Sequence, residues 1–175
     1  APPPKADPSI ALAKLELGPN VALSSDQVVV QQILALRTNS DEGIEWSFAF
    51  QSPSAQSPSG PLTFFASMIR GDEYRILLTS SQAFASELPV EGANEGRARY
   101  ALLFMAAPEP DMQAPSEGAP RFFAFRWELS RQAESGLWLT DKIQPLGETP
   151  PGAMPESYLT SVPYLLPMQL KQFMC

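Results

Sequence analysis

Hydrophobic positions change their spacing partway along the chain. Between residues 24 and 70 apolar side chains recur at intervals of three and four, which is typical of amphipathic helices. From about residue 80 onward they alternate with polar side chains at intervals of two, which is typical of half-buried strands. Helical patterns followed by strand patterns predict an α+β fold with N-terminal helices on an antiparallel sheet, and no internal repeat interrupts this order.

The first helix has the clearest start signal. Ser24 and Gln27 have the spacing of a capping box, in which each side chain bonds to the other residue's backbone N–H. Val29, Ile33 and Leu36 then recur at helical intervals. We therefore expect a helix that begins directly after Ser24.

Two further helices are expected before residue 70. Residues 41–50 form the second, because acidic residues near its start favour the positive end of the helix dipole. Residues 51–58 are rich in Ser, Pro and Gln, so we expect a loop there. Pro61 then opens a third helix, whose apolar stripe consists of Leu62, Phe65, Met68 and Ile69.

The strand region contains three segments with clear patterns. Residues 97–105 begin by alternating and become apolar on both faces, as a central strand does, with one face formed by Tyr100, Leu102 and Phe104. Residues 122–129 carry Arg126 and Glu128 on one side and four apolar residues on the other: Phe123, Phe125, Trp127 and Leu129. Residues 106–120 are an acidic, proline-rich hairpin loop, and residues 136–143 form the last strand.

Proline and apolar residues mark the two ends of the chain. Many of the 19 prolines lie near the termini, so we divide the chain into an extended N-terminal arm (1–23), a folded domain (24–146) and a C-terminal arm (147–175). The C-terminal arm is too apolar for a free tail and must pack on its own domain, a second copy or a partner. The residues expected to bind a partner are Tyr158, Leu159, Val162, Tyr164, Leu165, Leu166, Met168, Leu170 and Phe173.

The residue inventory excludes several classes of function. With 12 basic and 19 acidic side chains and a net charge of −7, the chain is a poor candidate for binding nucleic acid. Histidine is absent and Cys175 is the only cysteine, which excludes imidazole catalysis, Cys/His zinc sites and disulfides within the chain. We expect no cofactor, because no phosphate-binding glycine loop is present. The longest uncharged stretch, residues 46–69, has a polar middle, so we expect no transmembrane span.

Carboxylates are the remaining candidates for catalysis. Asp141 groups with apolar neighbours on the last strand, whereas Glu128 lies opposite the face of Trp127. Asp141 is therefore the better candidate for an inward acid with a raised pKa that acts as a base. The alternative is a position at the turn where the strand ends.

Two further pairs of charged residues each have two possible roles. Asp72 and Glu73 follow the third helix and either bind a cation or form a solvated helix end. Arg97 and Arg99 lie on one face of a strand and either grip an anionic ligand or partner, or pair with acids across the sheet.

Aromatic side chains offer the only pattern suited to a pocket. Eight of them could line a site for a flat hydrophobic ligand or could fill the core. The candidate pocket residues are Phe48, Phe104, Phe125 and Trp127.

Several motifs resemble a known family. They are SDQVV at 25–29, FAFQSP at 48–53, GPLTFFASMI at 60–69, Tyr74 and GLWL at 136–139. Over about residues 24–146 the chain resembles an uncharacterised branch of the nuclear-transport-factor-two-like superfamily. The resemblance implies a cone, in which a curved antiparallel sheet wraps around N-terminal helices. Superfamily enzymes such as ketosteroid isomerases and dehydratases place Asp, His or Tyr in the cone mouth, and this chain departs from that pattern by lacking histidine.

Two functions are compatible with these observations. The first is a non-catalytic interaction module, a peripheral structural or assembly subunit docked by its terminal arms to protein subunits of a larger complex. The start at Ala1 is typical of a protein whose targeting peptide has been removed, although an artificial start would explain it equally well. Together with the acidic balance and the lack of reactive groups, it gives the narrower expectation of a membrane complex in a plastid or other organelle, for instance a photosynthetic one. We expect the protein to be organellar or exported, with the plastid stroma or thylakoid lumen favoured. The second function is a small-molecule binder or isomerase-like enzyme that uses the cone cavity, with Asp141 as the acid-base residue.

Overall fold

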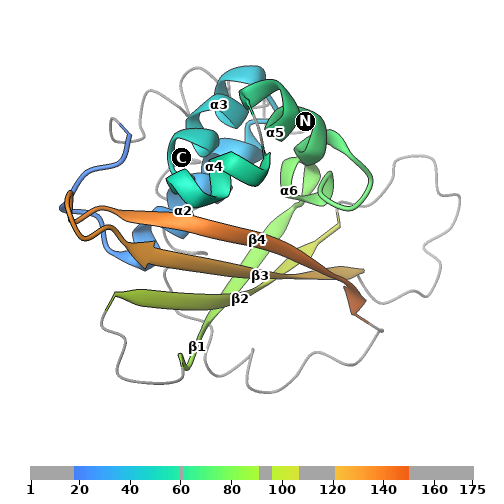
Figure 1. Cartoon of the computed structure of the whole chain (residues 1–175). Coiled ribbons are helices and arrows are strands. Elements are labelled where there is room, and N and C mark those ends of the chain that lie inside the picture. The colour runs from blue at the N-terminus through green and yellow to red at the C-terminus, as the bar shows by residue number, and fades with distance from the viewer. Residues whose placement is uncertain (1–17, 60, 91–95, 107–120, 150–175) are drawn as a thin grey trace, which may run out of the picture.

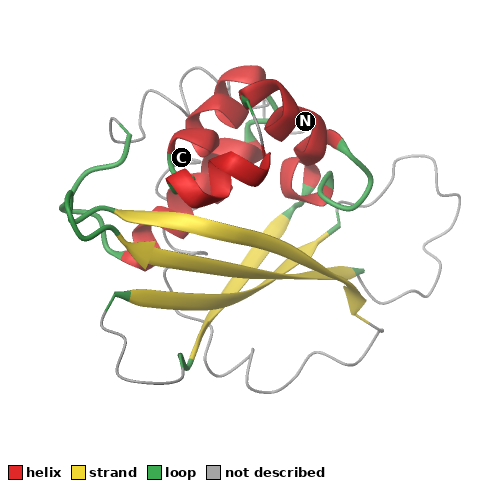
Figure 2. Cartoon of the chain, in the orientation of Figure 1, coloured by secondary structure: helices red, strands yellow, loops and turns green. Residues whose placement is uncertain are grey.

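The computed structural model describes residues 18–59, 61–90, 96–106 and 121–149. In these residues five helices precede four strands: α2 (Ser25–Arg37), α3 (Asp41–Ala49), α4 (Pro53–Ser59), α5 (Leu62–Arg70), α6 (Ile76–Thr79), β1 (Gln82–Leu88), β2 (Arg97–Met105), β3 (Phe122–Arg131) and β4 (Trp138–Thr149). The helices gather on one face of the sheet (Figures 1 and 2). The predicted α+β fold is confirmed.

The sheet is an antiparallel meander with strand order β1-β2-β3-β4. Figure 1 shows that it is twisted, because β1 runs obliquely to β3 and β4. The predicted alternation is confirmed: the face turned toward the helices carries Tyr100, Leu102, Phe104, Phe125, Trp127 and Leu129, all buried. Among the described residues the sheet is open, with β1 and β4 at its edges, so the cone remains a prediction.

Helix α2 begins as its capping box predicts. Gln27 Oε1 accepts a hydrogen bond of 2.9 Å from the backbone N–H of Ser24, and Ser24 is the N-cap. Nine consecutive residues, 28–36, are buried, because α3, α6 and β4 pack around the helix. The helix is therefore enclosed on all sides rather than amphipathic.

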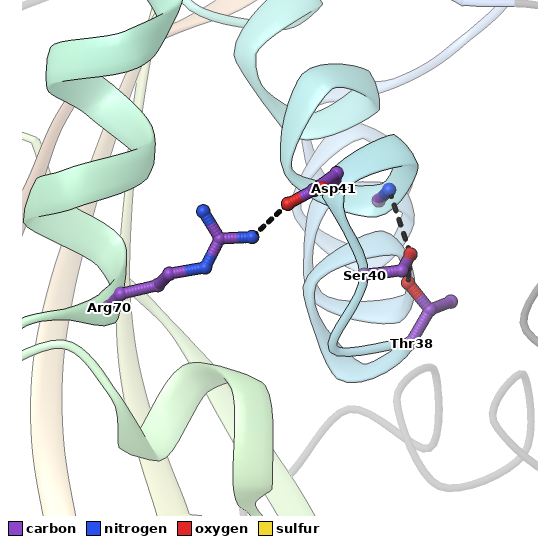
Figure 3. Close-up of polar contacts among 5 residues, drawn as sticks. Thr38, Ser40, Asp41 and Arg70 are labelled. Carbon is purple, nitrogen blue, oxygen red and sulfur yellow. Dashed lines mark hydrogen bonds and ion pairs between the residues drawn. The ribbon is translucent and has the colours of Figure 1, made fainter.

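The turn between α2 and α3 is held by hydroxyl groups (Figure 3). Thr38 Oγ1 donates to the carbonyl oxygen of Ala35 at 2.6 Å, and Ser40 Oγ accepts from the N–H of Gly43 at 3.1 Å, which caps α3. At the start of α3, Asp41 forms an exposed ion pair with Arg70 of α5. These contacts fix the angle at which α3 leaves α2.

The prediction of a loop over residues 51–58 is wrong, because helix α4 covers most of this segment. Pro53 is the first helical residue, where its missing N–H costs nothing, and Ser52 Oγ accepts from the N–H of Ala55 at 3.3 Å. The preceding chain is anchored to β4, since the Ser52 N–H donates to Thr140 O and the Thr140 N–H to Phe50 O, each at 2.8 Å. This tertiary anchor overrides the weak helical propensity.

The predicted second and third helices and the strand over 97–105 are confirmed, and two short elements were missed. Neither α6 nor β1 was predicted, and β4 continues through residues 147–149, beyond the predicted domain boundary. Most of both predicted arms and of the 106–120 loop lies outside the described residues.

Candidate functional site

The predicted pocket residues contribute to the core between helices and sheet. Phe104, Phe125 and Trp127 are at most 1% exposed, and the rings of Phe104 and Phe125 meet edge to face at 5.3 Å. Phe48 is half-buried and packs against Phe65, with ring centroids 5.2 Å apart. These side chains fill the centre of the domain, and Phe125 also lines a cavity at its end.

A buried polar cluster at Gln32 was missed by sequence analysis. Gln32 is fully buried, and its Oε1 accepts hydrogen bonds from Trp127 Nε1 at 2.9 Å and from Thr140 Oγ1 at 2.5 Å. Its Nε2 donates to the carbonyl oxygen of Ser47 at 3.0 Å. One amide thus joins α2, α3, β3 and β4, with both of its polar atoms hydrogen-bonded. Its role is structural, because the side chain is fully buried and holds together residues from four elements.

Asp141 does not continue the inward alternation predicted for it. Glu128 pairs with Lys142 and Leu129 with Thr140, so Asp141 is the extra residue of a β-bulge. It is half-buried at the edge of the sheet, where its Oδ1 accepts a 3.4 Å hydrogen bond from Ser54 of α4. Because the bulge reverses the alternation, Asp141 lies near the surface and does not line the cavity.

A cavity of about 690 Å³ lies where α6 meets the ends of β3 and β4. Its apolar wall includes Ile76, Phe123, Phe125 and Pro145. Its charged rim consists of Asp72, Glu73, Arg75, Arg121 and Glu148. The volume is that of a small-molecule site, and three acids against two arginines leave the rim slightly acidic.

The two arginines of the cavity differ in their surroundings. Arg121 forms a bidentate pair with Glu148, with Nε–Oε1 at 2.7 Å and Nη2–Oε2 at 3.0 Å, and its guanidinium lies 5.3 Å from the ring centroid of Phe123. This hydrogen bonding holds the pKa of Glu148 below its usual range. Arg75 is exposed beside the acids of the α5–α6 turn. Asp72 and Glu73 are exposed, as a solvated helix end is, and no group of three metal-ligating side chains occurs in the described residues.

Tyr74 stands behind the cavity wall. Its hydroxyl donates to the carbonyl oxygen of Ile143 at 3.3 Å, and its ring lies 6.1 Å from that of Phe125. Burial, together with the negative charge of Glu73, raises the pKa of Tyr74 above its ordinary value. The phenol therefore stays protonated at neutral pH and ties the α5–α6 turn to β4.

The face of the sheet turned away from the helices, here called the outer face, has an apolar end. Phe84 of β1 pairs in register with Leu103, and Phe122 of β3 with Met105. The rings of Phe84 and Phe122 lie 6.4 Å apart and are half-buried. No helix of the described residues lies on this face (Figure 2).

The other end of the outer face is charged. Glu128 lies between two arginines, with its Oε1 3.3 Å from Arg99 Nε and 3.6 Å from Arg126 Nε. The prediction that Arg99 pairs with an acid across the sheet is thus confirmed. Arg97 and Lys142 on the same face are exposed, and neither has an ion pair within the described ranges.

The residues predicted to bind a partner, from Tyr158 to Phe173, lie outside the described part of the chain. Among the helices that are described, none is long and apolar enough to cross a membrane. Comparison of the chain with protein-family models, with curated proteins and with solved structures finds no match. The resemblance to the nuclear-transport-factor-two-like superfamily therefore stays a prediction.

Proposed function

We propose that the chain is a non-catalytic interaction module, a peripheral structural or assembly subunit that docks onto a larger protein complex through its terminal arms. The observation that carries this proposal is the outer face of the sheet. Its half-buried aromatic side chains lie beside a charged patch, and Leu103 between them is only 2% exposed although no helix of the described residues covers this face. Such a face is suited to contact with another polypeptide.

The arrangement of acids and bases favours binding over catalysis. The cavity rim carries carboxylates that are exposed or paired, and Asp141 bonds to Ser54 at the surface. None of these carboxylates is buried in an apolar pocket, the usual means of raising the pKa of a general base. A photosynthetic or other organellar membrane complex remains the narrower proposal.

The test is the native mass of the full chain isolated from its source cells. We expect it to migrate with an assembly far larger than its own 19.1 kDa. A variant with Tyr164→Ser, Leu165→Ser and Leu166→Ser should migrate alone, because it loses apolar surface worth several kcal/mol at ~25 cal/mol per Å². A variant with Ser157→Ala, Thr160→Ala and Ser161→Ala, in the same arm, should keep the large mass.

Circular dichroism should show the same folded domain in all three proteins. If the unchanged chain migrates at its own mass, the proposal is wrong. If both variants keep the large mass, the arm is not the docking device.

The cavity favours a second function, the binding of a small molecule. The cavity of about 690 Å³ is lined by Phe123, Phe125 and Ile76 and would accept the apolar part of a ligand, whose polar end would contact Arg75 at the rim.

The probe for this site is the dye 8-anilinonaphthalene-1-sulfonate, whose fluorescence should increase when it binds. Thr79→Trp, which fills the cavity, should abolish this signal, whereas Thr63→Trp on the exposed surface of α5 should not. Equal fluorescence in the two variants would exclude this site.

A further inference from the structure

The charged residues around the cavity at α6 differ between its two sides. On the side of the sheet, Arg121 and Glu148 neutralise each other through two hydrogen bonds of 2.7 and 3.0 Å. On the side of the α5–α6 turn, Asp72, Glu73 and Arg75 are exposed, and none of them forms an ion pair within the described residues. The unpaired charges that a ligand in the cavity can contact therefore come from this turn.

The unpaired charges of the turn are of both signs. Two carboxylates and one guanidinium lie within residues 72–75. A ligand with only an anionic group is attracted by Arg75 but repelled by Asp72 and Glu73, and a ligand with only a cationic group meets the opposite balance. A ligand that carries both an ammonium and a carboxylate gains both attractions. Charge complementarity thus favours a zwitterion.

The wall of the cavity favours apolar side chains on the ligand. Phe125 is 1% exposed, and Ile76, Phe123 and Pro145 are half-buried. Aromatic and aliphatic groups bury the most apolar surface against such a wall. The volume of about 690 Å³ lies within the range of small-molecule pockets, roughly 300–1,000 Å³, so the ligand is small.

Resting on the small-molecule function proposed for this cavity, we propose that its ligand is a small apolar zwitterion, in chemical class an amino acid or dipeptide with aromatic or aliphatic side chains. The carboxylate of the ligand lies against Arg75, and its ammonium group lies against Asp72 and Glu73. Its side chains pack on Ile76 and Phe123. The turn between α5 and α6 thus selects the ligand by charge, and the ends of β3 and β4 hold its apolar part.

The test compares four ligands with the same apolar body, by isothermal titration calorimetry on the full chain. They are the dipeptide leucyl-phenylalanine, its N-acetyl form, its C-terminal amide and the form with both caps. The free dipeptide should bind most tightly. Each single cap should weaken binding by roughly fivefold, because ion pairs with exposed side chains are weak. Thr79→Trp, which fills the cavity, should abolish binding, whereas Thr63→Trp on α5 should not.

Substitutions in the turn assign each end of the ligand to its partner. With Arg75→Gln, the amide should bind as tightly as the free dipeptide, while the N-acetyl form still binds more weakly. With Asp72→Asn and Glu73→Gln together, the N-acetyl form should match the free dipeptide, while the amide still binds more weakly. The matched control is Arg70→Gln, exposed at the end of α5 and outside the cavity, which should keep both differences.

Several outcomes would overturn the inference. Equal affinities of the four ligands would show that neither charged end contacts the turn. Tighter binding of the N-acetyl form would show that the ligand is an anion, and tighter binding of the amide that it is a cation. If the dye binds in the cavity but none of the four ligands does, the inference is wrong and the small-molecule function stands. If neither the dye nor a peptide binds, both are wrong.

Discussion

At the residue scale, the least predictable position is Gln32. In the sequence it is a polar residue in a helical pattern and would be assigned to the solvent side. In the structure it is fully buried and holds Trp127, Thr140 and Ser47 through one amide. Local sequence cannot reveal such a residue, because its partners lie up to 108 positions away.

We expect Gln32→Leu to destabilise the domain by roughly 2–4 kcal/mol, because it leaves the Trp127 N–H, the Thr140 hydroxyl and the Ser47 carbonyl buried without partners. The measurement is the free energy of unfolding in urea. Trp127→Phe removes one of these donors, so the double variant should lose less than the sum of the two single losses. If the loss in the double variant equals the sum of the two single losses, Gln32 and Trp127 are not hydrogen-bonded.

Tyr100 predicts a dependence of stability on pH. Burial raises its pKa to about 12, although the hydrogen bond with Ser25 lowers it slightly. An unfolded tyrosine titrates near pH 10, so the stability gained from the protonated phenol is fully present below about pH 10 and is lost as the pH rises to 12. The unchanged protein should lose up to about 2–3 kcal/mol over this range relative to Tyr100→Phe. If the urea midpoints of unfolding of the two proteins change by the same amount from pH 9 to 12, the pKa of Tyr100 is not raised.

At the element scale, close contact between α2 and α3 depends on Gly43. A Cβ atom there would lie 2.2 Å from both Ala35 O and Thr38 Oγ1. Alanine ordinarily stabilises a helix by about 1 kcal/mol relative to glycine. The sequence alone would therefore favour alanine at this position.

We expect the opposite sign for Gly43→Ala, a loss of about 1–3 kcal/mol, because the two helices must separate to admit the methyl group. Thermal unfolding followed by circular dichroism measures this loss. Glu42→Ala at the neighbouring exposed position should change stability by no more than about 0.5 kcal/mol. A gain in stability for Gly43→Ala would show that α2 and α3 are not in close contact.

At the scale of the whole molecule, the two edges of the sheet differ. The β4 edge is tied to the chain before α4 by backbone hydrogen bonds at Thr140, whereas within the described residues β1 pairs only with β2. Backbone amides exchange with solvent more slowly when they are hydrogen-bonded in stable structure.

Hydrogen exchange should therefore be slowest in α2, β2 and β3 and faster in β1 than at Leu139 and Thr140. Mass spectrometry of peptides from each strand measures this order. If β1 is protected as strongly as β2, a segment outside the described residues must pair with the edge of β1 that faces away from β2, and the sheet would have a further strand.

The sequence by itself determined the α+β class, the capped start of α2 and the alternation of β2 and β3, because each follows from local spacing. It also excluded imidazole catalysis and disulfides within the chain, because histidine is absent and there is a single cysteine. Only the tertiary structure decided the helix at Pro53, the bulge that turns Asp141 to the surface, the buried amide of Gln32 and the cationic outer face. These features arise where distant segments meet: an anchor on β4 forms α4, and one extra residue in a strand changes which side chains face the core.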